Sequence, residues 1–142
     1  MITPKKSIAT RDVTEKFEKV SRDIFYYVQL GLIKPIDMVL YVKYLELFNE
    51  AYGYAFPTIY QLEDYLNCSR QSIVSANKRL VAAGLLIIKK HKKNNNIYIP
   101  LQPHTYEDLA KQVPHLLVEL EKRQEKIYSV ADQDKFRLNN LF

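Results

Sequence analysis

Apolar residues recur at helical spacing in the first part of the chain. In residues 10–30, Val13, Phe17, Val20 and Ile24 are separated by steps of four and three, which predicts one face of a helix. The same residues also fit an extended stretch over FEKVS, followed by a short helix over residues 23–30. The pattern leaves both alternatives open, and the polar first ten residues are expected to be loose.

A longer helix is predicted from Pro35, because the first turn of a helix tolerates proline. We expect it to be the most buried helix and to end near Gly53. The residues YAF that follow predict a short strand. The expected inward face of the helix consists of Ile36, Val39, Leu40, Val42, Tyr44, Leu45 and Leu47.

Two short helices and a hairpin follow, each with local signals. Thr58 and Gln61 have capping-box spacing, which predicts a helix over residues 59–66. The residues NCS make a three-residue break, and Ser69 is a suitable cap for a helix that Gly84 would end. LLIIKK and NIYIP predict two strands, joined by HKKNNN. The predicted inward residues of the second helix are Ile73, Ala76, Leu80 and Ala83.

The character of the sequence changes after Pro100. Thr105 and Asp108 again have capping spacing, and Pro114 breaks or restarts the helix that they predict. The last dozen residues are polar and are expected to fray. Between these points, one side of the chain carries the apolar stripe Leu117, Leu120 and Ile127.

Residues 35–100 resemble a winged helix-turn-helix DNA-binding domain. The resemblance is carried by Phe56-Pro57-Thr58, Ser69-Arg70-Gln71-Ser72-Ile73, Leu80 to Leu86, and Asn96-Ile97-Tyr98-Ile99. The domain is most similar to those of replication-initiation and primosome proteins of Gram-positive bacteria, their plasmids and phages, and to small transcription regulators. Asn77 departs from the pattern, in which this position is usually aliphatic.

The resemblance implies a mainly α fold with a small antiparallel sheet, in which N- and C-terminal helices flank the winged helix-turn-helix. We therefore divide the chain into a loose N-terminus (residues 1–10), a winged domain with its N-terminal helix (11–104), and a C-terminal helical extension with a polar tail (105–142).

The charge of the chain is concentrated in one segment. Between Tyr65 and Tyr106 there is no Asp or Glu, whereas seven Lys and Arg residues give this segment a charge of +7. The whole chain carries +5, so the rest of the chain carries −2. A surface that serves only solubility mixes both signs. The phosphates of double-stranded DNA, about one charge per 1.7 Å of duplex axis, favour such segregation of positive charge.

The segregation predicts which residues meet DNA. A helix of about fourteen residues spans roughly 21 Å and fits the major groove, with its N-terminal residues at the base edges. We therefore predict that Arg70, Gln71, Ser72 and Ser75 read bases and that Lys78 and Arg79 meet phosphates. Helix N-termini attract anions, which adds Thr58 and Tyr60. The full predicted DNA-binding set is Thr58, Tyr60, Ser69, Arg70, Gln71, Ser72, Ser75, Lys78, Arg79, Lys90, His91, Lys92, Lys93, Asn94 and Asn95.

Other interpretations of these residues compete with DNA binding. Lysines on a hairpin also discourage edge pairing, and winged helices sometimes bind only proteins. Cys68 is the only cysteine, so we interpret it as a packing residue and expect a reducing compartment. The three histidines lack metal-ligand spacing. The eleven tyrosines are interpreted as core and strand residues, because their helical spacing argues against a stacking platform for single strands.

Two functions are consistent with the sequence. The first is sequence-specific binding of double-stranded DNA, as a transcription regulator or as an origin- or centromere-binding protein of a plasmid or phage. The second is a replication adaptor whose winged helix mainly docks protein, which makes a replication or transcription protein a further partner. The flanking helices either cover the core or form a homodimer interface, and we predict a homodimer.

The sequence favours neither an enzyme nor a cofactor, because it contains no phosphate loop, metal cluster or nucleophile–base set. The N-terminus lacks the apolar core of a signal peptide, and the apolar run VAAGLLII is far shorter than the roughly 18 residues of a membrane helix. We therefore predict a cytoplasmic protein without membrane association.

Overall fold

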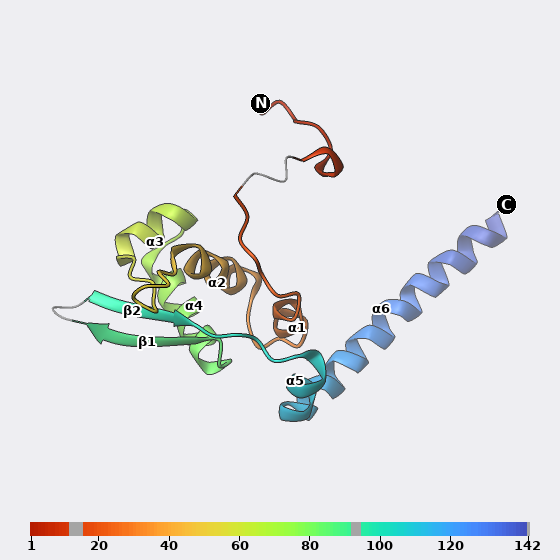
Figure 1. Cartoon of the computed structure of the whole chain (residues 1–142). Coiled ribbons are helices and arrows are strands. Elements are labelled where there is room, and N and C mark those ends of the chain that lie inside the picture. The colour runs from red at the N-terminus through yellow and green to blue at the C-terminus, as the bar shows by residue number, and fades with distance from the viewer. Residues whose placement is uncertain (12–15, 92–94, 142) are drawn as a thin grey trace.

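The computed structural model of the chain describes residues 1–11, 16–91 and 95–141 (Figure 1). It is mainly helical with one small antiparallel sheet, which confirms the predicted fold class. In Figure 1 the hairpin and the first four α-helices form one body, and α6 projects away from it. The elements are η1 Ile8–Thr10, α1 Ile24–Gln29, α2 Pro35–Leu47, α3 Ile59–Leu66, α4 Arg70–Ala82, β1 Leu86–His91, β2 Asn95–Pro100, α5 Tyr106–Gln112 and α6 Pro114–Leu141.

The local signals around α3 and α4 act as the sequence predicts. The hydroxyl of Thr58 accepts a hydrogen bond from the amide of Gln61, and the side chain of Gln61 accepts one from the amide of Thr58. The hydroxyl of Ser69 caps α4 by accepting from the amide of Ser72 at 3.2 Å. Between the helices, Asn67 has a left-handed backbone with φ of 47°. These caps fix where both helices begin and how sharply the chain turns between them.

The core lies where α2, α4 and the inner face of the hairpin meet. Tyr44 of α2 stacks on Tyr98 of β2 with 4.6 Å between ring centroids, which joins the helix to the sheet. The strands pair antiparallel, with Leu86 opposite Pro100 and His91 opposite Asn95. Fully buried side chains around this contact include Ile24, Tyr27, Leu40, Leu62, Ile73, Leu80 and Leu85.

The buried face of α2 differs from the predicted one. Val39 is 55% exposed and Ile36 lies at the surface, whereas Asp37 and Tyr41 are buried together with Leu40 and Tyr44. A face chosen by apolar letters alone misses these two residues. Both are accommodated because their polar atoms have partners, with the hydroxyl of Tyr41 donating to the carbonyl of Leu101 at 2.7 Å.

The N-terminal segment follows the second of the two alternatives. Residues 16–21 form no helix, and α1 begins only at Ile24, as the extended stretch followed by a short helix requires. Val20 reaches the core, but Phe17 is 53% exposed, so a longer helix would have little surface to pack against. The first eleven residues are exposed throughout, and Val13 lies outside the described residues.

Two further predictions change in extent. The strand predicted over YAF is reduced to isolated bridges, of which Ala55 with Tyr98 is held by two hydrogen bonds of 2.8 Å. Pro57 follows two residues later and has no backbone N–H that could continue a ladder of hydrogen bonds. The tail expected to fray is instead helical to Leu141. Pro114 restarts the helix, as one of the two alternatives at that position states.

The order of α2, α3, α4 and the hairpin is compatible with a winged helix-turn-helix. In the described ranges, no helix is both long and apolar enough to cross a membrane.

Candidate nucleic-acid interface

A buried ion pair fixes α4 against α2. Asp37 is fully buried, and both of its carboxylate oxygens accept hydrogen bonds from Arg79, from Nε at 2.7 Å and from Nη2 at 2.8 Å. The amide of Lys34 also donates to Asp37 at 2.7 Å. The hydrogen bonds to Asp37 raise the pKa of Arg79, so this guanidinium remains charged. The pair links the start of α2 to the second half of α4.

A second polar contact joins the same two helices. The hydroxyl of Tyr44 donates to the amide oxygen of Asn77 at 2.6 Å, and both side chains are buried. Burial raises the pKa of Tyr44, which therefore stays protonated as a donor. Asn77 is thus a hydrogen-bonding residue of the helix face, and the partner 33 residues away explains why an aliphatic residue is not needed here.

A groove of about 350 Å³ lies between the start of α3, the first half of α4 and the hairpin. Residues of α3 and α4 and residues of the hairpin line it together. It brings together four of the predicted DNA-binding residues, Thr58, Tyr60, Arg70 and Asn95. The complete lining is Pro57, Thr58, Ile59, Tyr60, Arg70, Val74, Asn77, Asn95, Asn96 and Tyr98.

Other predicted residues lie around this groove with different degrees of exposure. Gln71 and Lys78 are exposed on α4, as are Lys90 and His91 on β1. Ser72 and Ser75 are half-buried, so neither is enclosed in the core.

Ser69 makes two contacts with Ser72 in the first turn of α4. Its hydroxyl lies 3.0 Å from the hydroxyl of Ser72, in addition to capping the helix. The two serines therefore form a local pair at the first turn of α4.

Arg79 has a partner that the sequence prediction did not include. Two of its guanidinium nitrogens are bound to Asp37, which neutralises the charge that was assigned to phosphate. Asp37 reaches it from α2, which packs against α4. The described part of the acid-free segment contains five cations, of which Arg70, Lys78, Lys89 and Lys90 are outside this ion pair. Of the predicted wing residues, Lys92, Lys93 and Asn94 lie outside the described residues.

The groove also contains Val74, Asn77 and Asn96, which are not in the predicted DNA-binding set. Arg70, Val74 and Asn77 follow one another at helical spacing and line the same wall. Asn96 lines the opposite wall beside Asn95. Val74 could have been identified from the sequence, because it lies four residues after Arg70 and therefore on the same face of the helix.

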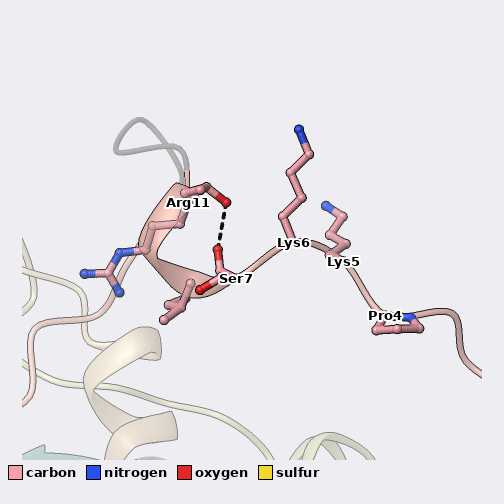
Figure 2. Close-up of a pocket in the computed structure, with 7 residues that line it drawn as sticks. Pro4, Lys5, Lys6, Ser7 and Arg11 are labelled. Carbon is pink, nitrogen blue, oxygen red and sulfur yellow. Dashed lines mark hydrogen bonds between the residues drawn. The ribbon is translucent and has the colours of Figure 1, made fainter.

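A larger hollow, of about 740 Å³, is formed by the N-terminal segment alone (Figure 2). It lies inside the turn from Pro4 to Arg11, where the hydroxyl of Thr10 donates to the carbonyl of Ser7 at 2.8 Å. Lys5 and Lys6 point away from the turn in Figure 2 rather than converging on it. All of its residues are exposed. We therefore assign no site to it.

The titratable residues do not gather into a metal site in the part of the chain that the structure describes, where no group of three or more His, Cys, Asp or Glu side chains could hold an ion. Cys68 is half-buried and packs against the core at the turn before α4.

Comparison with known proteins adds little to this geometry. No protein-family model and no curated protein matches the chain. A solved structure described as the N-terminal domain of a DNA binding protein resembles it with a TM-score of 0.43 and 18% sequence identity, over 79% of this chain and 93% of that chain. A likeness this distant carries no argument about fold or function, which leaves the groove and its charges as the basis for a functional proposal.

Proposed function

We propose that residues 35–100 form a winged helix-turn-helix domain that binds double-stranded DNA sequence-specifically. The proposal rests on one observation, the groove in which Arg70 of α4 faces Asn95 and Asn96 of the hairpin. Six of the ten residues that line this groove come from the acid-free segment, in whose described part Arg70, Lys78, Lys89 and Lys90 are exposed. An acid-free cationic surface beside a helix N-terminus suits a polyanion.

The roles of the residues follow from their exposure. Arg70 and Gln71, at the first turn of α4, are the proposed readers of base edges, because the N-terminal part of a recognition helix enters the major groove. Lys78, Lys89 and Lys90 are the proposed phosphate contacts. Ser72 and Ser75 are small and half-buried, which allows close approach of the helix to the bases.

The biological setting that we propose is a transcription regulator, or an origin- or centromere-binding protein of a plasmid or phage. Sequence selection from a random duplex library, followed by anisotropy titration of the selected duplex, tests the binding. With four to six phosphate contacts, log Kd against log salt should have a slope of roughly 4 to 5, about 0.9 per contact. No selected sequence, together with a flat salt response, would contradict the proposal and favour an adaptor that docks protein.

We also propose that the protein acts as a homodimer through α6. This helix has 28 residues, roughly 42 Å at 1.5 Å per residue. Its first turns pack on the body through Leu116, Leu117 and Leu120, and Arg123 donates to the carbonyl of Gln29 at 2.9 Å. From residue 125 onward, every side chain whose exposure is described is exposed.

The free part of α6 suits a second copy of itself. In this part, Ile127 and Leu138 lie at positions that share one seam in a seven-residue repeat. The helix carries five basic and five acidic residues, so two copies would not repel each other. Gln124 and Asp134 fall on the same seam and limit the strength of the pairing.

Sedimentation equilibrium tests this part of the proposal. The wild-type chain should sediment as a dimer, and Ile127→Lys should shift it to a monomer, whereas Val130→Lys, off the seam, should not. In the dimer the two recognition helices should lie about 34 Å apart and the selected DNA should be a near-palindrome. A monomeric wild-type protein would refute the dimer while leaving the DNA proposal intact.

A further inference from the structure

Three aromatic side chains form a cluster in the loop between α2 and α3, in which Tyr52 and Phe56 are exposed and Tyr54 is half-buried. The rings of Tyr52 and Tyr54 stack with centroids 5.9 Å apart, and the ring of Phe56 lies 5.9 Å from Tyr52 and 6.1 Å from Tyr54. Tyr52 is 61% exposed and Phe56 is 53% exposed. We call Tyr52, Tyr54 and Phe56 the aromatic platform.

The platform is held in place by the backbone around it. The amide of Asn49 donates to the carbonyl of Tyr54 at 3.1 Å, and the side chain of Asn49 accepts from the amide of Tyr52 at 3.1 Å. Gly53, with φ of +79°, supplies the left-handed turn that brings the two tyrosines together. Ala55 is then bound to Tyr98 of β2 by two hydrogen bonds. The hydrogen-bonded turn thus presents the rings of Tyr52 and Phe56 to solvent, where they contribute little to the core, and this points to a ligand.

The platform adjoins both parts of the proposed interface. Phe56 directly precedes Pro57 and Thr58, which line the groove. On the other side, the ring of Tyr54 lies 6.4 Å from that of His91, at the end of β1. Figure 1 shows the loop between α2 and α3 passing beside β2, toward the end of the hairpin. A nucleic-acid strand that leaves the groove therefore has the platform next to it.

The surrounding charge favours a nucleic acid over an apolar protein surface. Lys89 and His91 project from the same face of β1, because side chains alternate along a strand. Lys43 lies over the ring of Tyr65, 4.4 Å from its centroid, on the α2–α3 side, although Glu46 pairs with this lysine. Glu50 is the carboxylate within the loop itself, and it is exposed.

We propose that Tyr52, Tyr54 and Phe56 form a stacking platform for unpaired bases of single-stranded DNA beside the duplex groove. The inference rests on the proposed DNA-binding function and extends it to a junction between duplex and single strand. Exposed aromatic rings next to cationic side chains bind single strands because every base has a face that stacks. The helical spacing of the tyrosines argues against a stacking platform on the helices. Tyr52, Tyr54 and Phe56 lie outside the helices, so this argument does not apply to them.

The test uses the full chain and a fluorescein-labelled 12-nucleotide oligothymidine, titrated by anisotropy at low salt. Tyr52→Ala and Phe56→Ala should each weaken binding of this oligonucleotide at least about fivefold, the lower range for loss of one stacked base. Tyr52→Phe should retain the affinity, because it keeps the ring. Phe25→Ala serves as the matched control, since Phe25 is 58% exposed but lies on α1, outside the proposed interfaces.

The two proposals fail in different ways. Arg70→Ala should weaken duplex binding and leave oligothymidine binding within about twofold, whereas Phe56→Ala should do the reverse. Duplex binding without measurable oligothymidine binding would overturn the platform and keep the proposed function. Loss of self-association in Tyr52→Ala, with unchanged oligothymidine affinity, would identify the platform as a protein contact and also overturn it.

A second readout covers the case in which an alanine variant fails to fold. The chain contains no tryptophan, so Tyr52→Trp introduces a single reporter into the platform. Its fluorescence should be quenched on addition of oligothymidine and should change little with intact duplex. An emission spectrum that does not respond to oligothymidine would contradict stacking at this position.

Discussion

Polar residues of α4 fall into two groups, those that are hydrogen-bonded to α2 and those that are exposed. Toward α2, Arg79 and Asn77 are bound to Asp37 and Tyr44 within the domain. At the start of the same helix, Arg70 is exposed and lines the groove. The same residue types therefore hold the helix in place on one side and remain available to a ligand on the other.

This comparison teaches that a count of cations overestimates a binding surface. Arg79 contributes to the charge of the acid-free segment, yet its partner Asp37 comes from a helix 42 residues earlier in the chain. A cation contributes to binding a polyanion only if no carboxylate in the fold is bound to it. Substitutions on the inner side of α4 should therefore change stability, and those on the outer side should change binding.

The largest expected effect is on the inner side. Asp37→Ala should lower the free energy of unfolding by about 3–5 kcal/mol, because it leaves a partly buried guanidinium without its partner. Urea denaturation measures the change. Asp37→Leu combined with Arg79→Met should recover most of the stability and leave the salt dependence of DNA binding unchanged. A salt slope reduced by about one contact in the double variant would show that Arg79 does meet a phosphate.

Tyr44→Phe tests the second inner contact. It should destabilise the fold by about 1–3 kcal/mol, since the buried amide oxygen of Asn77 loses its donor. Adding Asn77→Leu should return the stability close to that of the wild type, because both polar partners are then gone. Equal stability of the single variant and the wild type would mean that this hydrogen bond contributes nothing.

Alkaline pH should lower the stability of the fold. Burial raises the pKa of Tyr27, Tyr41 and Tyr44 above the ordinary value of 10.0. In the unfolded chain these hydroxyls ionise near pH 10, whereas in the folded chain they remain protonated. Their contribution to stability is therefore complete below about pH 10 and is lost as the pH rises above it. Melting curves from pH 8 to pH 11 should show this fall, and Tyr44→Phe should make it shallower.

On the outer side, Arg70→Ala should change binding rather than stability. It should cost about 1–3 kcal/mol of binding free energy to the selected duplex and little to a scrambled one, which relaxes sequence preference. Anisotropy titrations of both duplexes measure the difference. An equal loss on both would assign Arg70 to the phosphate backbone instead.

The smallest expected effect belongs to the hairpin. Lys90→Ala should weaken binding of selected and scrambled duplexes alike and reduce the salt slope by about one. Its unfolding midpoint should match that of the wild type, because Lys90 is exposed. A change in sequence preference would place Lys90 at a base edge.

The elements that rest on local chemistry could be predicted from the sequence. Thr58 with Gln61, Ser69 and Gly84 are signals within a few residues of the backbone groups that they serve, and they indicate the bounds of α3 and α4 closely. Asn77 departs from the expected pattern and has a partner in the interior.

The contacts that depend on distant partners could not be predicted in this way. No local sequence signal indicates that Asp37 is buried. Arg79 cannot be distinguished from the other cations of its helix until the two helices are packed together. The extent of the N-terminal helix likewise depends on what Phe17 has to pack against, which periodicity does not contain. The aromatic platform escapes a search for tyrosine spacing over the whole chain, because its three rings gather within one turn.

The linker between β2 and α5 is hydrogen-bonded to a buried residue of α1. The amide of His104 donates to the hydroxyl of Tyr27 at 2.9 Å, although His104 itself is exposed and Tyr27 is buried. Deuterium should therefore replace the hydrogen of this amide more slowly than its exposed position alone would allow, so that the amide would report on the opening of the contact between the linker and α1.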